Sequence, residues 1–349
     1  MKLLEYINQG KTYIIAEMSA NHAGSLENAK EIIYAAKEAG ADCVKLQTYT
    51  ADTMTIDCNN KYFYIDNGTW KGENLYSLYK KAYTPWEWHA GLKELADKIG
   101  IDIFSTPFDK TSVDFLEETG MEFYKIASFE LVDIPLIEYI AQKKKPIVIS
   151  TGMGSLEEIT EAVGTVKKYG CWLALLKCSS AYPAITDGMD LNTMLDMGKR
   201  FGCPVGLSDH SMGSLGAVAA VSMGATVIEK HFCLDRKIKS PDSVFSMEPL
   251  EFKKMVQDIH VVEKARGVVY YGPSVQEKDN VMFRRSIFAV KDICAGEVLT
   301  DENIRVIRPG HGIKPKYWNK VLGKKVNKPV AKGTPLSFDM LDVVSLQER

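Results

Sequence analysis

Two histidines occupy equivalent places in a repeated pattern, each just after a run of residues with strand character. His210 follows the apolar run 205–207, and His231 follows the run 226–228. Residues 216–223 between them have the small side chains of a closely packed helix. In a strand–helix–strand unit the two strands are parallel, so both histidines are expected at one edge of the sheet. Neutral imidazoles suit Mn²⁺, Fe²⁺, Co²⁺ or Zn²⁺. The pair therefore predicts a divalent metal site, with ordinary hydrogen-bonded histidines as the alternative.

Two lysines lie inside strand-like runs whose other residues are apolar. Lys45 and Lys125 would be costly to bury in such strands without a partner, so an anionic ligand is a reasonable one. A salt bridge inside a barrel, for instance between Lys45 and Glu17, is the structural alternative. A Schiff-base role for Lys125 is also open, because barrel aldolases use a lysine in this way.

Other polar side chains follow strand-like runs at the same phase. Glu17 and Glu130 are carboxylates suited to proton transfer or to binding sugar hydroxyls. Several hydroxyl groups could donate to an anion, together with backbone N–H groups at helix N-termini. They belong to Thr106, Ser128, Ser150, Thr151 and Ser208. Each alone is usually a turn former or helix cap, but their common phase indicates a shared site.

Eight strand-plus-helix units are needed to position these residues, and all fit within about the first 265 residues. The strand-like runs are 13–17, 43–46, 101–104, 123–127, 146–149, 173–176, 205–207 and 226–228. This number and length predict a (β/α)₈ TIM barrel, whose active site lies where the strands end. A doubly wound open sheet is the alternative. However, residues 21–24 after the first strand, Asn-His-Ala-Gly, do not form a glycine-rich nucleotide fingerprint.

The composition narrows the range of partners and compartments. The 349 residues are 46% hydrophobic and 25% charged, with a net charge of −2. This balance predicts no attraction to nucleic acid or to an anionic membrane surface. The sequence shows neither a signal peptide nor an apolar run long enough to span a bilayer. Seven cysteines without a CxxC pair are typical of a reducing cytoplasm, so we expect a cytoplasmic protein.

Two segments depart from the repeated pattern. Residues 50–84 form a connection rich in tyrosine that predicts a lid or a specificity element; a cluster that only packs the helix below it is the alternative. Residues 266–282 have the glycine, proline and charge of a linker. Residues 283–349 contain short runs and frequent turns, which predict a small β-rich domain. Arg308 in this domain could supply a charge to the barrel, with a plain surface arginine as the alternative.

The segments that carry these residues, taken together, resemble the sialic acid synthase family. In chain order they read IAEMSANHAGS, KLQTYT, FSTPFD, YKIASFE, ISTGM, SSAYP, GLSDH, EKHF and PDSVFSMEP. Members of that family condense phosphoenolpyruvate with an N-acetylated amino sugar to make a nonulosonic acid. The resemblance covers nearly the whole chain, because the last 65 or so residues are similar to the family's antifreeze-like (SAF) domain.

The resemblance implies a TIM barrel followed by an SAF domain, and a homodimer swapped through that domain. It also implies a divalent metal, Mn²⁺ first, with Mg²⁺ or Co²⁺ as other candidates. The implied metal ligands are His210 and His231. The implied phosphoenolpyruvate contacts are Lys45, Thr106, Lys125, Ser128, Ser150, Ser180 and Ser208. The implied sugar contacts are Glu130, Tyr182, Asp242 and, from the partner subunit, Arg308. Glu17 falls on the family's catalytic acid/base, with Lys125 and His231 beside it, and Gln47 on a neighbouring polar contact.

Residues 68–89, GTWKGENLYSLYKKAYTPWEWH, are most similar to one branch of the family. That branch uses 2,4-diacetamido-2,4,6-trideoxy-altrose as its sugar. Residues 180–183 read Ser-Ala-Tyr-Pro, where the N-acetylneuraminate enzymes have Asn-Ile-Tyr-Pro. We therefore expect the diacetamido sugar as substrate. N-acetylneuraminate or legionaminic acid synthesis is the alternative within the family, and a Schiff-base aldolase is the alternative outside it.

Overall fold

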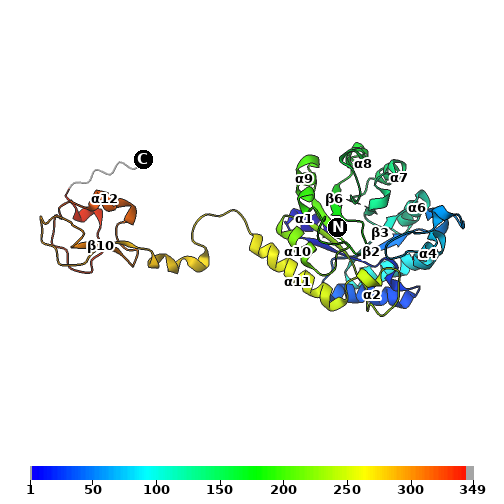
Figure 1. The fold of residues 1–349 in the computed structure, drawn as a ribbon, viewed down its shortest axis with the longest axis horizontal. Coiled ribbons are helices and arrows are strands. Elements are labelled where there is room, and N and C mark those ends of the chain that lie inside the picture. Colours follow the sequence, from blue (N-terminus) through cyan, green and yellow to red (C-terminus); the bar gives the residue numbers. More distant parts are fainter. Residues whose placement is uncertain (1, 343–349) are drawn as a thin grey trace. The chain divides into compact units, whose positions relative to one another are not determined.

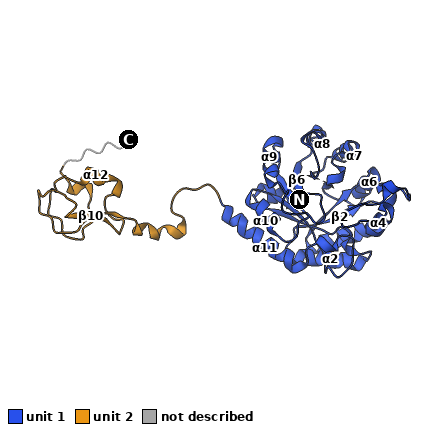
Figure 2. Ribbon diagram, viewed as in Figure 1, with its two compact units in different colours: residues 1–267 blue, residues 268–349 orange. Residues whose placement is uncertain are grey.

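The structure, a computed structural model, describes residues 2–342 and divides the chain into two compact units (Figure 2). Unit 1 comprises residues 1–267 and unit 2 residues 268–349. Unit 1 contains a closed barrel of eight parallel strands in sequence order. The strands are β1 (Tyr13–Glu17), β2 (Cys43–Thr48), β3 (Asp102–Pro107), β4 (Tyr124–Ile126), β5 (Ile147–Ser150), β6 (Leu173–Cys178), β7 (Val205–Asp209) and β8 (Val227–His231). The predicted (β/α)₈ barrel is confirmed, and the doubly wound alternative is wrong because β1 pairs with β8.

Helices surround this barrel on the outside (Figure 1). They are α2 (Leu26–Glu38), α5 (His89–Ile99), α6 (Lys110–Glu118), α7 (Ile134–Ala141), α8 (Leu156–Lys168), α9 (Leu191–Phe201), α10 (Leu215–Ser222) and α11 (Pro249–Arg266). A short helix, α1 (Lys2–Asn8), precedes β1. The helices begin where the sequence provides caps. Ser25, for example, accepts a hydrogen bond from the Asn28 N–H at the start of α2, and the apolar face of α2 is buried.

Alternate residues of each strand point into the barrel. At the amino ends of the strands these interior positions form an apolar plug that includes Tyr13, Phe104, Phe123 and Val227. At the carboxyl ends the interior positions are polar or charged. The barrel interior therefore changes from apolar to charged along its axis, and the change brings the candidate residues together.

Several strands continue past the limits expected from sequence. The second run, expected at 43–46, extends to Thr48 as β2, and the last, expected at 226–228, extends to His231 as β8. Pairing with the neighbours explains the difference, because Gln47 pairs with Thr106 and His231 with Glu17. The predicted strands stop at the first polar residues of each run. In the structure, hydrogen bonds to the neighbouring strands of the closed barrel keep these polar residues in the sheet.

The long connection after β2 folds into two helices, α3 (Ala51–Met54) and α4 (Leu75–Ala82), with a single turn at 61–63. Asn74 caps α4 by accepting a hydrogen bond from the Ser77 N–H. Tyr79 of α4 packs edge-on against Tyr49, with ring centres 5.7 Å apart. The connection therefore has its own regular structure and an aromatic anchor on unit 1.

Unit 2 is built from short elements, as predicted. An antiparallel pair, β9 (Ser286–Ala289) and β10 (Ile304–Ile307), and the short helix α12 (Trp318–Val321) enclose a small apolar core. The final part of the predicted domain, 343–349, lies outside the described residues. Throughout 2–342, no helix combines the length and the apolar character that a membrane span requires.

Candidate active site

Four charged side chains, all almost fully buried, meet inside the barrel at the carboxyl ends of its strands. Lys45 Nζ lies 3.2 Å from Glu17 Oε2 and 2.9 Å from Glu229 Oε1. Lys125 Nζ lies 3.7 Å from Glu229 Oε1 and donates to Ser150 Oγ at 2.6 Å. The salt bridge between Lys45 and Glu17, considered above as an alternative, is thus part of the structure. The larger share of the pairing, however, falls on Glu229.

The electrostatics give the two carboxylates different roles. Burial raises the pKa of Glu17 to about 7, against the opposing effect of Lys45. Burial acts on Glu229 in the same direction, but Lys125 and Lys45 outweigh it and hold the pKa of Glu229 well below its usual range. Burial also lowers the pKa of Lys125 to about 8. Glu229 is therefore a fixed counter-ion, and Glu17 is the carboxyl that can exchange a proton near neutral pH.

Hydroxyl groups lie beside the charged cluster. Ser208 Oγ donates to the β8 carboxylate at 2.9 Å, and the Gly152 N–H donates to Ser128 Oγ at 3.0 Å. A Cβ atom on Gly152 would lie 2.2 Å from Ser180 Oγ and 2.8 Å from Ser128 Oγ, so the absence of a side chain at this position lets both hydroxyls lie close to the backbone. Thr106 Oγ1 is buried and finds no hydrogen-bond partner within residues 2–342. These groups, together with the two lysines, offer hydrogen bonds that a carboxylate or phosphate can accept.

His210 and His231 lie together at the ends of β7 and β8, with ring centres 5.2 Å apart. His210 Nδ1 lies 3.1 Å from the Ser179 carbonyl oxygen, which assigns its proton to Nδ1 and leaves Nε2 as a ligand atom. His231 Nδ1 is buried and has no hydrogen-bond partner among the residues described, and burial lowers the pKa of its imidazole, which favours the neutral form. Two imidazoles that bind one ion at about 2.1 Å have ring centres at a comparable separation.

The donor set fits a metal whose remaining positions are open. Among the described residues, no group of three or more His, Cys, Asp and Glu side chains is arranged to hold a metal ion. A closed structural site is therefore absent from this part of the chain. Two histidines beside a pocket instead resemble a catalytic site, in which water and substrate oxygens complete the coordination.

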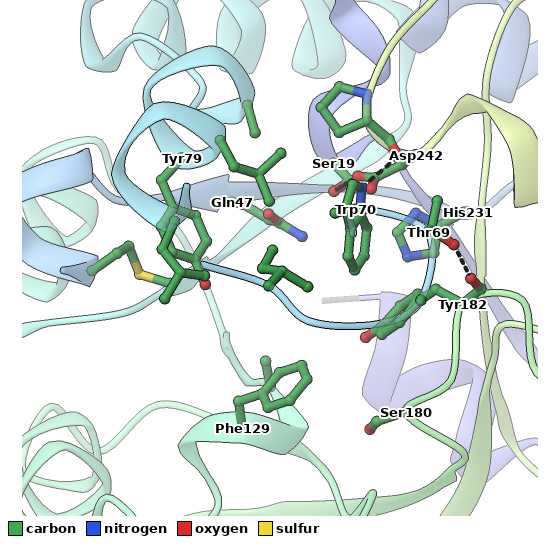
Figure 3. A pocket seen from close by; sticks show the side chains of 18 of the residues that line it. Ser19, Gln47, Thr69, Trp70, Tyr79, Phe129, Ser180, Tyr182, His231 and Asp242 are labelled. Atoms are coloured by element: carbon green, nitrogen blue, oxygen red, sulfur yellow. Dashed lines mark hydrogen bonds between the residues drawn. The ribbon is translucent and has the colours of Figure 1, made fainter. Parts of the chain in front are cut away.

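A cavity of about 760 Å³ opens over the strand ends (Figure 3). Its polar lining gathers near the barrel and includes Ser19, Gln47, Glu130, Ser180, His231 and Asp242. Its apolar lining comes mostly from the long connection and includes Met54, Ile65, Leu75, Leu78, Tyr79 and Phe108. Figure 3 shows Tyr79 on the side opposite His231 and Asp242, with Gln47 between them. The cavity therefore has a reactive polar end and an apolar end.

The connection 50–84 is held across this cavity by two hydrogen bonds. Trp70 Nε1 donates to the Pro241 carbonyl at 2.9 Å, and the Thr69 hydroxyl donates to the Tyr182 carbonyl. The Trp70 and Tyr182 rings are 5.4 Å apart. The segment lines the cavity, as expected of a lid or specificity element. It also packs on Tyr49, as expected of an aromatic packing cluster.

The three expected sugar contacts of unit 1 line the same cavity. Asp242 Oδ2 accepts hydrogen bonds from Ser19 Oγ at 2.5 Å and from the Ala20 N–H at 3.3 Å. Tyr182 lies with its ring 4.3 Å from that of His210. Glu130 has one buried oxygen without a partner in the described chain, and burial raises its pKa to about 7.

Fifteen of the sixteen residues predicted from sequence, Thr151 directly after β5 among them, lie in unit 1, at or beside these strand ends, and only Arg308 does not. It is an exposed residue of unit 2 and is described within that unit alone. Sequence reasoning missed Glu229, Ser19 and Trp70. Glu229 carries the signal that revealed the two lysines, a charged residue inside an apolar strand, whereas Ser19 and Trp70 carry no such signal.

A family model described as the NeuB family matches residues 32–271, and one described as the SAF domain matches residues 284–342. The chain is 45% identical to the pseudaminic acid synthase of Helicobacter pylori, across 94% of this chain and 97% of that protein. It is 39% identical to the N,N'-diacetyllegionaminic acid synthase of Legionella pneumophila, across 95% and 94%.

Among solved structures, one similar protein is the N-acetylneuraminic acid synthetase of Leptospira borgpetersenii, in complex with citrate. The two chains superpose with a TM-score of 0.70 and are 32% identical. The match covers 78% of this chain and 90% of that one.

Proposed function

The chain belongs to the NeuB family, and from this premise we propose that it is a pseudaminic acid synthase. It condenses phosphoenolpyruvate with 2,4-diacetamido-2,4,6-trideoxy-L-altrose and water, and it releases pseudaminic acid and phosphate. The observation that supports a diacetamido trideoxy sugar over N-acetylmannosamine is the apolar end of the cavity, formed by Met54, Leu78, Tyr79 and their neighbours. Such a sugar ends in a C6 methyl group and carries two acetamido methyl groups, whose burial lowers the free energy. The higher identity to a pseudaminic acid synthase than to a legionaminic acid synthase, 45% against 39%, favours the altrose.

The charged floor of the barrel suits phosphoenolpyruvate. Lys45 and Lys125 supply positive charge, and Thr106, Ser128, Ser150, Ser180 and Ser208 supply hydroxyls around them. An anion that enters this floor adds negative charge next to Glu17, whose carboxyl already has a pKa of about 7. The bound anion therefore raises that pKa further, so that Glu17 takes up a proton as the substrate binds.

We assign His210 and His231 as ligands of a divalent metal, Mn²⁺ first, with Mg²⁺ or Co²⁺ as the other candidates. Such an ion, when bound, polarises the aldehyde of the open-chain sugar as a Lewis acid. Glu130, Tyr182 and Asp242 hold the sugar hydroxyl and acetamido groups, and Gln47 donates to Glu17 Oε1 at 2.9 Å. Holding two substrates face to face is a large part of the catalysis.

The chemistry then follows from the order of the groups in the site. Carbon 3 of phosphoenolpyruvate forms a bond to the aldehyde carbon of the sugar, whose oxygen accepts a proton. Water adds to carbon 2 and loses a proton. The C–O bond to phosphate then breaks, and the hydroxyl on the tetrahedral carbon loses its proton to the departing phosphate, which leaves a ketone. Glu17 gives one proton and receives the other, and Lys45 and Lys125 hold the charge of the departing phosphate.

The rim of the barrel supports a homodimer swapped through the SAF domain. The loops and first helical turns that follow strands β4 to β8 expose large apolar side chains. They are Phe129, Val132, Met153, Leu156, Ile185, Met212, Leu215 and Val244. Exposed apolar side chains gathered on one side of a barrel rim are typical of an interaction surface. The SAF domain of a second copy would cover it and bring Arg308 to the sugar.

The proposal also includes the domain limits and the cellular compartment expected from the sequence. Residues 1–265 form the catalytic barrel, 266–282 the linker and 283–349 the SAF domain. The seven cysteines are all free, which favours a reducing cytoplasm.

Phosphate release with mass spectrometry of the product tests the function. The protein is supplied with Mn²⁺, phosphoenolpyruvate and, in separate reactions, the diacetamido trideoxy-altrose, its legionaminic acid counterpart or N-acetylmannosamine. Turnover with the altrose supports the proposal, whereas preference for another sugar moves the assignment within the family. Trapping of pyruvate on Lys125 by borohydride, without phosphate release, would establish the Schiff-base aldolase instead.

A further inference from the structure

One buried ion pair on the barrel has no part in the chemistry proposed above. Asp209 ends β7, and Lys230 is its register partner in β8. Lys230 Nζ lies 2.7 Å from Asp209 Oδ2, and both side chains are at most 1% exposed. The next residue after each of them is a proposed metal ligand, His210 or His231.

The pair points away from the barrel interior. Side chains alternate along a strand, and Glu229 and His231 point inward, so Lys230 between them points outward. Leu207, two residues before Asp209, packs in the apolar layer between barrel and helices, whereas Val227 belongs to the interior plug. The ion pair therefore lies in the apolar layer behind the histidines and makes no contact with the cavity through its own side chains.

The pair fastens the backbone on both sides of His210. Lys230 Nζ donates to the Ser211 carbonyl at 2.6 Å, and Asp209 Oδ1 accepts from the Ser211 N–H at 2.8 Å. Asp209 and Ser211, the neighbours of His210, are thus both bonded to Lys230, the residue before His231. These bonds fix the backbone at His210 relative to the backbone at His231.

Helix α10 closes over the pair with a glycine. A Cβ atom on Gly216 would lie 3.1 Å from Asp209 Oδ2 and 2.7 Å from Met189 Cε. The absence of a side chain at this position lets the helix cover the ion pair closely and keep water away from it. A buried, closely covered pair holds its geometry more firmly than a solvated one.

Stability alone is a poor explanation for such a pair. Desolvation costs several kcal/mol for each ion, and apolar residues of similar volume are often as good or better for stability. Setting a register is the better attested use of buried ions. We propose that Asp209 and Lys230 are positioning residues that fix His210 relative to His231 and thereby set the affinity for the divalent metal. This inference rests on the proposed metal site and not on the identity of the sugar.

Titration of the metal-free protein with Mn²⁺ tests the proposal, with free Mn²⁺ measured from its EPR signal. The variants are Asp209→Asn, which keeps the shape, and the double variant Asp209→Leu with Lys230→Met, which leaves no unpaired buried charge. Loss of the outer partners of metal ligands typically lowers metal affinity by about 10- to 100-fold, and we expect a loss of that size in both variants. The control is Asp196→Asn, which breaks an exposed pair with Arg200 on α9 and should leave the affinity unchanged.

Two further measurements separate positioning from damage to the fold. Thermal unfolding shows whether the double variant is folded, and calorimetric binding of phosphoenolpyruvate without metal shows whether the floor around Lys45 and Lys125 is intact. A folded double variant that binds phosphoenolpyruvate normally but Mn²⁺ weakly supports the proposal. The same variant with wild-type Mn²⁺ affinity overturns it. If the wild-type protein itself fails to bind Mn²⁺, the proposed metal site falls, and this inference falls with it.

Discussion

Replacing Glu229 with glutamine should destabilise the protein and at the same time strengthen its response to anions. Glu229 Oε1 lies 2.9 Å from Lys45 Nζ, 3.7 Å from Lys125 Nζ and 2.9 Å from Ser208 Oγ. The substitution keeps the shape of the side chain and removes the charge. Two buried ammonium groups then face each other with only Glu17 to balance them.

The expected magnitude follows from the cost of breaking a buried pair, about 3 to 5 kcal/mol. For a unit of this size, 1 kcal/mol lowers the melting temperature by roughly 2 to 4 °C, so we expect a decrease of roughly 10 °C. In the proposed site, phosphoenolpyruvate brings negative charge to the same two lysines. It should therefore raise the melting temperature of the Glu229→Gln variant by more than that of the wild type, because ligand binding stabilises the folded state that it neutralises.

Thermal unfolding followed by circular dichroism, with and without phosphoenolpyruvate, measures both effects. Glu94→Gln, an exposed position on α5, is the matched control and should behave as the wild type. Equal melting temperatures for wild type and Glu229→Gln, or an equal response to phosphoenolpyruvate, would show that Glu229 is not the counter-ion of the lysines.

Three further predictions concern other parts of the site. Glu17→Gln should abolish turnover while calorimetry still detects phosphoenolpyruvate binding; a wild-type kcat would refute its proton-transfer role. The folded-state pKa of Glu130, about 7, exceeds its unfolded value, so its contribution to stability is present below pH 4.5 and is lost as the pH rises through 7. Glu130→Gln should therefore gain roughly 1 to 3 kcal/mol over the wild type at pH 8 in urea unfolding and little at pH 4.5; a pH-independent difference would contradict this. In a swapped dimer, mixing inactive Arg308→Ala and Glu17→Gln subunits should restore about a quarter of the activity, because half of the dimers would hold one intact site. No recovery would argue against the swap.

The barrel could be predicted from sequence because its signal is local and repeated. Each strand-like run ends in a polar residue at the same phase, and the helix that starts after Ser25 has both its cap and its apolar face in the sequence. The strand ends were harder, since Gln47 and His231 are held in the sheet by partners far along the chain. Polarity alone does not reveal such pairing.

Site residues could be predicted where a charged side chain stands in a strand that is otherwise apolar. Lys45 and Lys125 are conspicuous because charge inside a buried strand requires a partner, and the same logic points to Glu229 once the lysines are accepted. Ser19 is different. Its link to Asp242 joins residues 223 positions apart, and a serine after a strand is an ordinary residue. Trp70 likewise gains its place from contacts with Tyr182 and Pro241 that no local pattern specifies.

The proposed positions of the two substrates also predict a kinetic order. The cavity lining in the described chain includes Gln47, Ser180 and His231, whereas Lys125 and Ser150 are buried within the barrel. In the proposed site, a sugar in the cavity would cover the phosphoenolpyruvate held by these buried groups. We therefore expect phosphoenolpyruvate to bind first, and a sugar that binds early to form a dead-end complex. We expect the nine-carbon acid to leave before phosphate, so that phosphate competes directly with the next phosphoenolpyruvate.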